Sequence, residues 1–258
     1  MSRTQSSELA AARLQKIAEI VRSKRIVRVD ELSKTLTVSP ATIRRDLRML
    51  EKRGGMQRVH GGALSSESKI EEPMFDDKTA IATKEKYAIA QAALKFIKPN
   101  DSIFLDGGST ILTLAGMLQD AVHLTVVTNS LRVASTLSGK GPNVILVGGE
   151  LRRLSQTFVG PLTKPVLDEL HVDSAFIGTI ALSHREGLTT TDPREAFTKK
   201  TVMAHARQVI LLADSSKIGK ISFVRFGSLS DVHILITDKK AARKQLDGIR
   251  KKGVRVIT

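Results

Sequence analysis

Apolar residues recur at helical spacing in the first sixty residues. Ile43, Leu47 and Leu50 fall at i, i+4 and i+7, so they form one face of a helix. Ser39 is a preferred N-cap, and Pro40 suits the first helical position, where no backbone N–H is needed. The sequence therefore predicts a helix with a defined start and a one-sided apolar face.

Shorter patterns flank this helix on both sides. Apolar residues at i, i+3, i+4 and i+7 over residues 9–23 predict an amphipathic helix. Alternation at 27–29 indicates a short strand, and Asp30 is suited to cap a second short helix. Residues 56–60 alternate as a small β-hairpin would. Two helices joined by a tight turn and followed by a hairpin form a winged helix-turn-helix, with the helix-turn-helix at about 27–46.

The pattern changes from about residue 84. Residues 84–97 predict a helix whose inner face carries Ile89, Ala93 and Phe96. Short, nearly unbroken apolar runs then alternate with helical stretches, which is typical of strands covered on both faces. We therefore expect an α/β domain with a mostly parallel sheet and helices on each side. The predicted strands are residues 102–105, 124–127, 144–147, 175–177, 209–213, 232–236 and 254–257.

A polar segment separates the two patterns. Residues 64–73 are rich in serine and end in proline, as a tether does. The prediction is a small N-terminal domain at 1–63, a linker at 64–83 and an α/β domain at 84–258.

The formal net charge is +15, and it is unevenly distributed. Residues 1–60 hold 14 Lys and Arg against 6 Asp and Glu, a net +8, whereas the other 198 residues hold 27 against 20, a net +7. This concentration indicates a polyanionic partner for the N-terminal domain, and double-stranded DNA is the polyanion that a helix-turn-helix reads. A membrane surface is less favoured, because no amphipathic helix with bulky aromatic residues occurs there.

The composition excludes several classes of protein. Hydrophobic residues make up 41% of the 258, enough for a real core, and cysteine is absent. Its absence rules out disulfides and thiol catalysis and suits a reducing cytoplasm. No apolar run approaches the roughly 20 residues of a membrane span, and no secretory signal follows the N-terminus. The six histidines never lie three or four residues apart, so no metal site is predicted.

The predicted DNA-reading helix presents a basic face. Arg44, Arg45 and Arg48 lie opposite its apolar residues, and arginine either reads guanine by two parallel hydrogen bonds or clamps phosphates. The alternative is a solvated face on which the arginines pair with Asp46 and Glu51. The candidate DNA contacts are Ser39, Thr42, Arg44, Arg45, Arg48, Arg58 and His60, the last two on the predicted wing.

Small and polar residues follow several predicted strands at their carboxyl ends, where open α/β sheets bind ligands. The turn at 107–110, Gly-Gly-Ser-Thr, opens a helix and suits an anion, because glycine admits the ligand and the helix N-terminus has free N–H groups. Lys217 would add a full charge, and Ser130 is suited to cap the next helix. A plain strand-to-helix turn explains the glycines equally well. The candidates here are Asp106, Gly107, Gly108, Ser109, Thr110, Thr128, Asn129, Ser130, Gly148, Gly149 and Lys217.

Two sets of residues resemble the DeoR family of bacterial transcription regulators. One comprises residues 38–47, Leu50-Glu51 and residues 58–63. The other comprises the polar strand ends above together with residues 158–160, 186–190, 192–200 and 214–217. The resemblance runs from about residue 10 to the end.

This resemblance implies a winged helix-turn-helix that reads operator DNA, with Ser39 to Arg48 as its recognition helix. It also implies a sensor domain that is similar in fold to sugar-phosphate isomerases and binds phosphorylated sugars or related metabolites. Glu195 and Lys199 join the candidate effector-binding residues on the same ground.

An isomerase-like fold makes an enzyme the rival hypothesis. An isomerase needs a positioned carboxylate as general base, and Asp106, Asp192 and Glu195 are candidates. The same carboxylates can accept sugar hydroxyls or pair with Lys199 and Lys200. We expect a sensor rather than an enzyme, because a basic DNA reader is fused to it, and we assign no catalytic residue, metal or cofactor.

The expected function is a DNA-binding repressor of a sugar catabolism or transport operon, released from its operator by a phosphorylated sugar. A protein that coats DNA without sequence preference is a further alternative. Reading a two-fold operator requires at least a dimer, and the resemblance implies a homodimer or homotetramer with no membrane partner. The mechanism requires the glycine–hydroxyl turn and Lys217 to share one cavity, and a placement on opposite sides of the sheet would contradict it.

Overall fold

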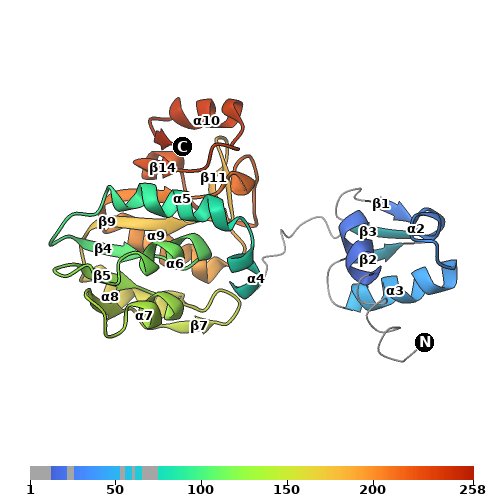
Figure 1. Ribbon diagram of the computed structural model, residues 1–258, viewed down its shortest axis with the longest axis horizontal. Coiled ribbons are helices and arrows are strands. Elements are labelled where there is room, and N and C mark those ends of the chain that lie inside the picture. Colours follow the sequence, from blue (N-terminus) through green and yellow to red (C-terminus); the bar gives the residue numbers. More distant parts are fainter. Residues whose placement is uncertain (1–12, 22–25, 53–55, 60–61, 66–74) are drawn as a thin grey trace. The chain divides into compact units, whose positions relative to one another are not determined.

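The computed structural model describes residues 13–21, 26–52, 56–59, 62–65 and 75–258 (Figure 1). The chain divides into two compact units, Met1–Glu71 and Glu72–Thr258. None of the helices within the described residues is long and apolar enough to cross a membrane.

The first unit is a winged helix-turn-helix, as predicted. Ile17, Leu32, Ile43 and Leu47 are fully buried in its core. The spacing of apolar residues predicted an inward-facing side for each of the three helices that carry them. Strand β3 lies between the other two strands of an antiparallel sheet. The elements are a helix over residues 13–21, β1 (Ile26–Arg28), α2 (Val29–Leu36), α3 (Pro40–Lys52), β2 (Met56–Val59) and β3 (Gly62–Ser65).

One predicted cap is wrong. Helix α2 begins at Val29, one residue before Asp30, and its N-cap is Arg28 without a side-chain hydrogen bond. Asp30 instead lies in the first turn, where a carboxylate still interacts favourably with the free N–H groups of the helix.

The second unit is built on a seven-stranded sheet in the order β15-β14-β12-β9-β4-β5-β6, and every neighbouring pair is parallel. All seven predicted runs form these strands, with ends shifted by at most three residues. The strands are β4 (Ser102–Leu105), β5 (Thr125–Thr128), β6 (Asn143–Leu146), β9 (Val172–Gly178), β12 (Ala206–Leu212), β14 (Ile234–Ile236) and β15 (Arg255–Ile257).

The unbroken apolar runs exist because the sheet has a core on each face. Along β4, Ile103 and Leu105 pack under α5, α6 and α7, whereas Phe104 between them faces α8, α9 and α10. Figure 1 shows the first three helices in front of the sheet and α9 behind it. The helices are α5 (Thr83–Leu94), α6 (Ser109–Gly116), α7 (Leu131–Leu137), α8 (Lys164–Asp168), α9 (Pro193–Ala204) and α10 (Arg243–Arg250).

The structure adds elements that the hydrophobic pattern did not predict. Helix α4 (Phe75–Ala80) lies in the segment predicted as linker, and Phe75 is buried and donates its N–H to Leu154 O. The second unit therefore begins before residue 84. Short antiparallel pairings supply the remaining strands, which are β7 (Glu150–Arg152), β8 (Thr157–Val159), β10 (Ala181–Ser183), β11 (Gly187–Thr190) and β13 (Val224–Gly227).

Candidate functional site

The basic face of α3 is open to solvent. Ile43, Leu47 and Leu50 of this helix are buried, whereas Arg44, Arg45 and Arg48 are exposed. Three guanidinium groups thus project from one face, where a planar, permanently charged fork can meet phosphate or a guanine edge.

Ser39 caps α3 as predicted. Its Oγ accepts a hydrogen bond from the Thr42 N–H at 3.2 Å and lies 2.9 Å from the Thr42 hydroxyl. Because both hydroxyls lie at the exposed start of the helix, they occupy the position from which a recognition helix approaches base edges.

Asp46 is turned inward and pairs with Arg13. It is 4% exposed and its Oδ2 accepts from Nε of Arg13 at 2.6 Å, which ties α3 to the helix over residues 13–21. The hydrogen bond that Arg13 donates to Asp46 raises the pKa of Arg13. Asp46 therefore anchors the recognition helix from behind and leaves Arg44 and Arg45 on the opposite side.

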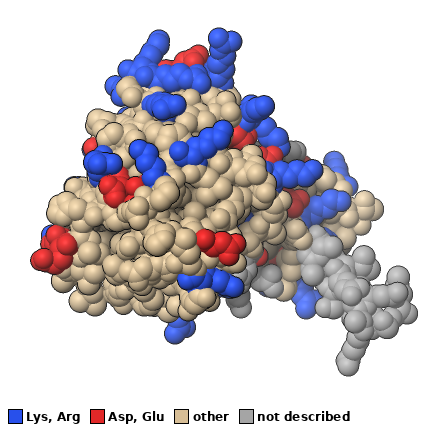
Figure 2. Space-filling view, turned by 60° about the vertical axis from the view of Figure 1, so that its left-hand side comes forward, with Lys and Arg blue, Asp and Glu red and all other residues tan. Residues whose placement is uncertain are grey.

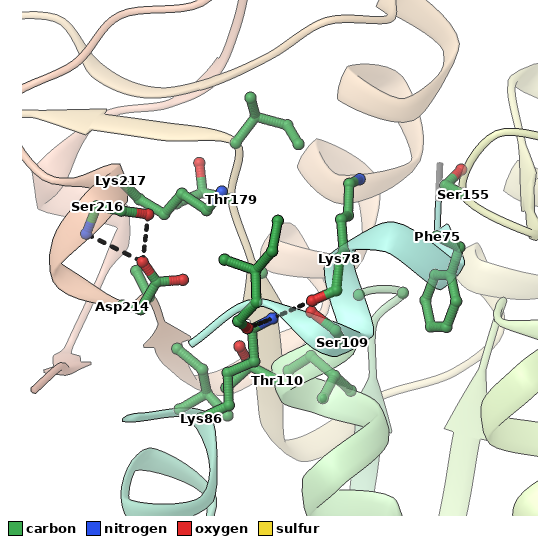
Figure 3. A pocket seen from close by; sticks show the side chains of 18 of the residues that line it. Phe75, Lys78, Lys86, Ser109, Thr110, Ser155, Thr179, Asp214, Ser216 and Lys217 are labelled. Carbon is green, nitrogen blue, oxygen red and sulfur yellow. Dashed lines mark hydrogen bonds between the residues drawn. The ribbon is translucent and has the colours of Figure 1, made fainter. Parts of the chain in front are cut away.

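A cavity lies at the carboxyl ends of the strands in the second unit (Figure 3). The residues that line it come mainly from five places, which are α4 with the start of α5, the turn into α6, the end of β9, α9, and the loop after β12. They include Phe75, Lys78, Ile81, Lys86, Gly107, Gly108, Ser109, Thr110, Thr179, Glu195, Lys199, Asp214, Ser216 and Lys217. The glycine–hydroxyl turn and Lys217 thus share one cavity, as the regulatory hypothesis requires.

The turn into α6 needs both of its glycines. Gly108 is the N-cap and has φ +127°, a conformation that side chains disfavour. A Cβ on Gly107 would lie 2.1 Å from Thr157 Cγ2. The turn therefore exposes the N-terminal N–H groups of α6 to the cavity without a side chain in front of them.

The loop after β12 presents a carboxylate beside a lysine. Asp214 is buried and accepts from both the N–H and the hydroxyl of Ser216. Asp238 accepts from the Ser215 N–H at 2.6 Å, which fixes the loop from below. Lys217 ends this short turn and lines the cavity.

Lys199 is a buried cation in the cavity wall. Its ammonium donates to Asp106 and to Gly178 O, lies 3.5 Å from Glu195 Oε1, and sits over the Phe226 ring at 5.6 Å from its centre. Asp106 is buried behind the wall rather than in it. Asp106 and Lys199 thus form an internal ion pair, so the Lys199 ammonium is only partly available to a ligand.

Sequence reasoning missed Lys86, a second buried cation of this cavity. It is 5% exposed, and its ammonium donates to the carbonyl oxygens of Lys78 and Ile81 at the end of α4 (Figure 3). Burial lowers the pKa of Lys86, and Lys217 and Lys78 lower it further against the opposing effect of Asp214. One signal was available, since Lys86 precedes Ile89 and Ala93 by three and seven residues, on the apolar face of α5.

The comparisons with known proteins decide the family. A model described as the DeoR-like helix-turn-helix domain matches residues 13–69, and a model described as the DeoR C terminal sensor domain matches residues 81–239. The chain belongs to the DeoR family of transcriptional regulators. Both models describe parts of a regulator, so the chain is placed among regulators and not among enzymes.

Full-length relatives in this family agree. The chain is 39% identical to the uncharacterized HTH-type transcriptional regulator YulB of Bacillus subtilis over 96% of both proteins. It is 37% identical to the HTH-type transcriptional regulator GlpR of Haloferax volcanii, over 96% of this chain and 98% of that protein. It is also 37% identical to the lactose phosphotransferase system repressor of Streptococcus mutans, over 88% of this chain and 91% of that protein.

Among solved structures, the ribose 5-phosphate isomerase of Methanocaldococcus jannaschii resembles part of the chain. The match has a TM-score of 0.39 and 20% identity, and it covers 51% of this chain and 52% of that one.

Several residues predicted for the effector site of this DeoR-family chain lie outside the cavity lining. Thr128 donates to Leu105 O and accepts from the Ser130 N–H, and Ser130 caps α7 as predicted. Asn129 donates to Phe158 O at 2.9 Å. Gly148 and Gly149 do not line the cavity either. The residues at 128–130 thus tie strand β5 to its neighbours, so their polar character has a structural cause.

The remaining predictions concern the wing and metals. Arg58 lies in strand β2, and His60 lies outside the described residues. The described part of the chain contains no group of three or more metal-binding side chains.

Proposed function

We propose that this DeoR-family regulator is a repressor of a sugar catabolism or transport operon, and that a phosphorylated sugar bound in the cavity releases it from operator DNA. The observation that carries the proposal is the meeting of the α6 N-terminus with Lys86 and Lys217 in one cavity. Free N–H groups at a helix start and ammonium groups beside them favour an anion such as phosphate.

Charge crowding supports an anionic ligand. Lys86, Lys78 and Lys217 line one cavity, and the last two lower the pKa of the first, against the opposing effect of Asp214. Like charges held together in a partly enclosed space repel each other, and a bound phosphate relieves that repulsion.

Polar groups around the phosphate position suit the rest of a sugar. Asp214 and Glu195 carry carboxylates at the cavity, and Thr179 and Ser216 carry hydroxyls. Carboxylates accept hydrogen bonds from sugar hydroxyls, so these residues are the proposed contacts of the carbohydrate part. The lactose-system name of one relative fits a carbohydrate-linked role.

We place the coupling to DNA in α4. This helix lines the cavity, is held at its start by the Phe75 N–H bond to Leu154 O, and is held at its end by the Lys86 ammonium. It is also the first described element after the DNA-binding unit. A phosphate that draws the Lys86 ammonium toward itself takes a hydrogen-bond partner from the end of α4, and the shift of α4 reaches the DNA-binding unit through the chain.

The turn at the end of α4 is suited to a change of backbone conformation. Ala82 has φ 54°, which is left-handed for a residue with a side chain, and it begins α5 without a side-chain cap. The Lys86 bonds to Lys78 O and Ile81 O span this turn. An effector that binds one arrangement of the turn more tightly shifts the population toward it.

A two-fold operator requires at least two DNA-binding units. We therefore propose that the regulator acts as a homodimer or homotetramer.

The test is a panel of sugar phosphates applied to the full-length protein. At least one compound is expected to raise the melting temperature, to lower operator affinity, and to remain chemically unchanged. Lys217→Ala should keep DNA affinity and blunt the release, whereas Lys220→Ala, an exposed lysine outside the cavity lining, should respond as the wild type does. Normal release by the Lys217 variant would contradict the proposed site, and steady isomerisation would favour an enzyme.

A further inference from the structure

Surplus positive charge outside the DNA-binding unit is confined to one end of the chain. Residues 61–237 hold 19 Lys and Arg against 18 Asp and Glu, a net +1. Residues 238–258 hold 8 against 2, a net +6 in 21 residues. The basic surplus of the second unit therefore belongs to α10, β15 and the turns beside them.

These cations stand on the surface. Helix α10 buries Leu246 and Ile249 and turns its other side to solvent. In Figure 2, Lys and Arg gather at the top of the view, where Figure 1 places α10. The C-terminal basic cluster is defined as Lys239, Lys240, Arg243, Lys244, Arg250, Lys251, Lys252 and Arg255, all exposed.

Neighbouring carboxylates neutralise only part of this cluster. Lys240 pairs with Glu85, and Arg243 and Arg250 share Asp247 at 4.0 and 3.0 Å. Lys244, Lys251 and Lys252 form no ion pair within the described part of the chain. Several positive charges are therefore available to an external partner.

Helix stability does not explain the cluster. Cations near the end of a helix interact favourably with its dipole, which accounts for Arg250, Lys251 and Lys252. Arg243 and Lys244 begin the same helix, where positive charge is unfavourable, and the first turn of the helix holds no acidic residue. Charge maintained against this local cost indicates binding to an anion.

We propose that the C-terminal basic cluster is a second DNA-contacting surface, which binds the phosphates of duplex DNA near the operator that α3 reads. The cluster lies in a protein whose family binds DNA, so duplex DNA is its nearest polyanion. Residues 238–258 contain no aromatic side chain for stacking on single strands. None of the exposed large apolar residues lies there to enter a membrane. Lysine-rich contacts to phosphate carry no sequence preference, so this surface strengthens binding to operator and random DNA alike.

The first test reverses charge in the full-length protein. Lys244→Glu, Lys251→Glu and Lys252→Glu together should weaken binding to operator and to random duplex DNA by about tenfold at ~0.1 M salt, and should reduce the slope of log affinity against log salt by about one for each lost contact. The matched control combines Lys95→Glu, Lys98→Glu and Lys140→Glu, three exposed lysines of the same unit that change net charge equally. The control should stay within about twofold of the wild type. Equal affinity and slope for cluster variant, control and wild type would overturn the proposal.

The second test needs no variant. Acetylation of the wild-type protein should modify Lys244, Lys251 and Lys252 less when duplex DNA is bound, while Lys95 and Lys140 react as before. Unchanged reactivity of the cluster would contradict the proposal. The proposal would also be contradicted if the cluster variant kept its DNA binding but lost binding to phosphatidylglycerol vesicles. A change of oligomeric state in solution with DNA binding intact would contradict it as well. Neither negative result would affect operator recognition by α3, so this inference can fail while the proposed function stands.

Discussion

The two units use positive charge in opposite ways. On α3 of the first unit, Arg44, Arg45 and Arg48 are exposed. In the second unit, Lys86 and Lys199 are 5% and 3% exposed and are held by carbonyl or carboxylate oxygens. An exposed guanidinium meets a large, rigid polyanion at the surface, whereas a buried ammonium is suited to one small anion and responds to its arrival.

This difference fits the tasks that we propose for the two units. Exposed charges in water contribute mainly through many phosphate contacts and are screened by salt. A buried ammonium is costly without a partner, so removing or supplying a partner changes the conformation that surrounds it. The first unit is therefore suited to grip DNA, and the second to switch.

Removing the exposed arginines should give the largest effect. Arg44→Ala with Arg45→Ala is expected to weaken operator binding by about a hundredfold, because each good arginine contact contributes about 1–3 kcal/mol. Titrations on operator and random DNA across salt concentrations show whether base preference or the salt slope changes. Lys34→Ala, an exposed change in α2, is the control. Wild-type affinity and slope in the double variant would exclude both arginines from the interface.

Removing the Arg13–Asp46 ion pair tests what holds the recognition helix in the first unit. Asp46→Ala leaves the Arg13 guanidinium without its carboxylate and is expected to cost about 1–3 kcal/mol of unfolding free energy. Urea unfolding should show the loss in the first unit only. Glu19→Ala removes an exposed carboxylate from the helix that carries Arg13 and should have little effect. Equal losses in the two variants would mean that Asp46 is no anchor.

Lys86→Met should separate ligand binding from DNA release. Methionine keeps much of the buried stem but cannot donate to Lys78 O and Ile81 O. We expect weak operator binding without ligand, and a ratio of affinities with and without sugar phosphate that falls from about tenfold toward one. Lys84→Met changes an exposed lysine of the same helix and should keep the full ratio. A normal ratio in Lys86→Met, with only a lower melting temperature, would assign Lys86 a purely structural role.

Acid should weaken the second unit by a smaller, graded amount. Burial would raise the pKa of Asp192, but hydrogen bonds from Arg194 and Arg152 lower it well below its usual range. The pKa of Asp173 is lowered by hydrogen bonds from Ser102. Carboxyls with lowered pKa values stabilise the fold fully above about pH 4 and lose that contribution as the pH falls further.

Urea unfolding at pH 7, 5, 4 and 3 measures this loss. The midpoint should fall below about pH 4, and Asp192→Asn should flatten the curve relative to Asp120→Asn, an exposed control. Parallel curves for the two variants would contradict the role of Asp192.

The sequence predicted the fold correctly wherever a hydrophobic pattern is compatible with only one kind of element. Unbroken apolar runs predicted every strand of the parallel sheet, because both faces of that sheet are covered. Helix α4 was missed because its short, polar sequence follows a serine-rich segment and has no helical period. The antiparallel strands were missed because each is only three or four residues long, and because β13 pairs with a distant segment, as for Arg225 opposite Thr189.

The candidate sites divide in the same way. Helical spacing placed the three arginines of α3 on the exposed face, and the turn at 107–110 was identified by its composition. Thr128 and Asn129 share that composition but bond inward to neighbouring strands. Lys86 was not identified, because a lysine inside an apolar helix face has meaning only once the carbonyls that it meets are known.

The most direct test of the account measures operator affinity and sugar-phosphate affinity in the same full-length protein. If the cavity governs the grip on DNA, one sugar phosphate lowers operator affinity by about tenfold or more, and saturating operator lowers affinity for that sugar phosphate by the same factor. A compound that binds and raises the melting temperature, yet leaves operator affinity unchanged at saturation, would contradict the coupling.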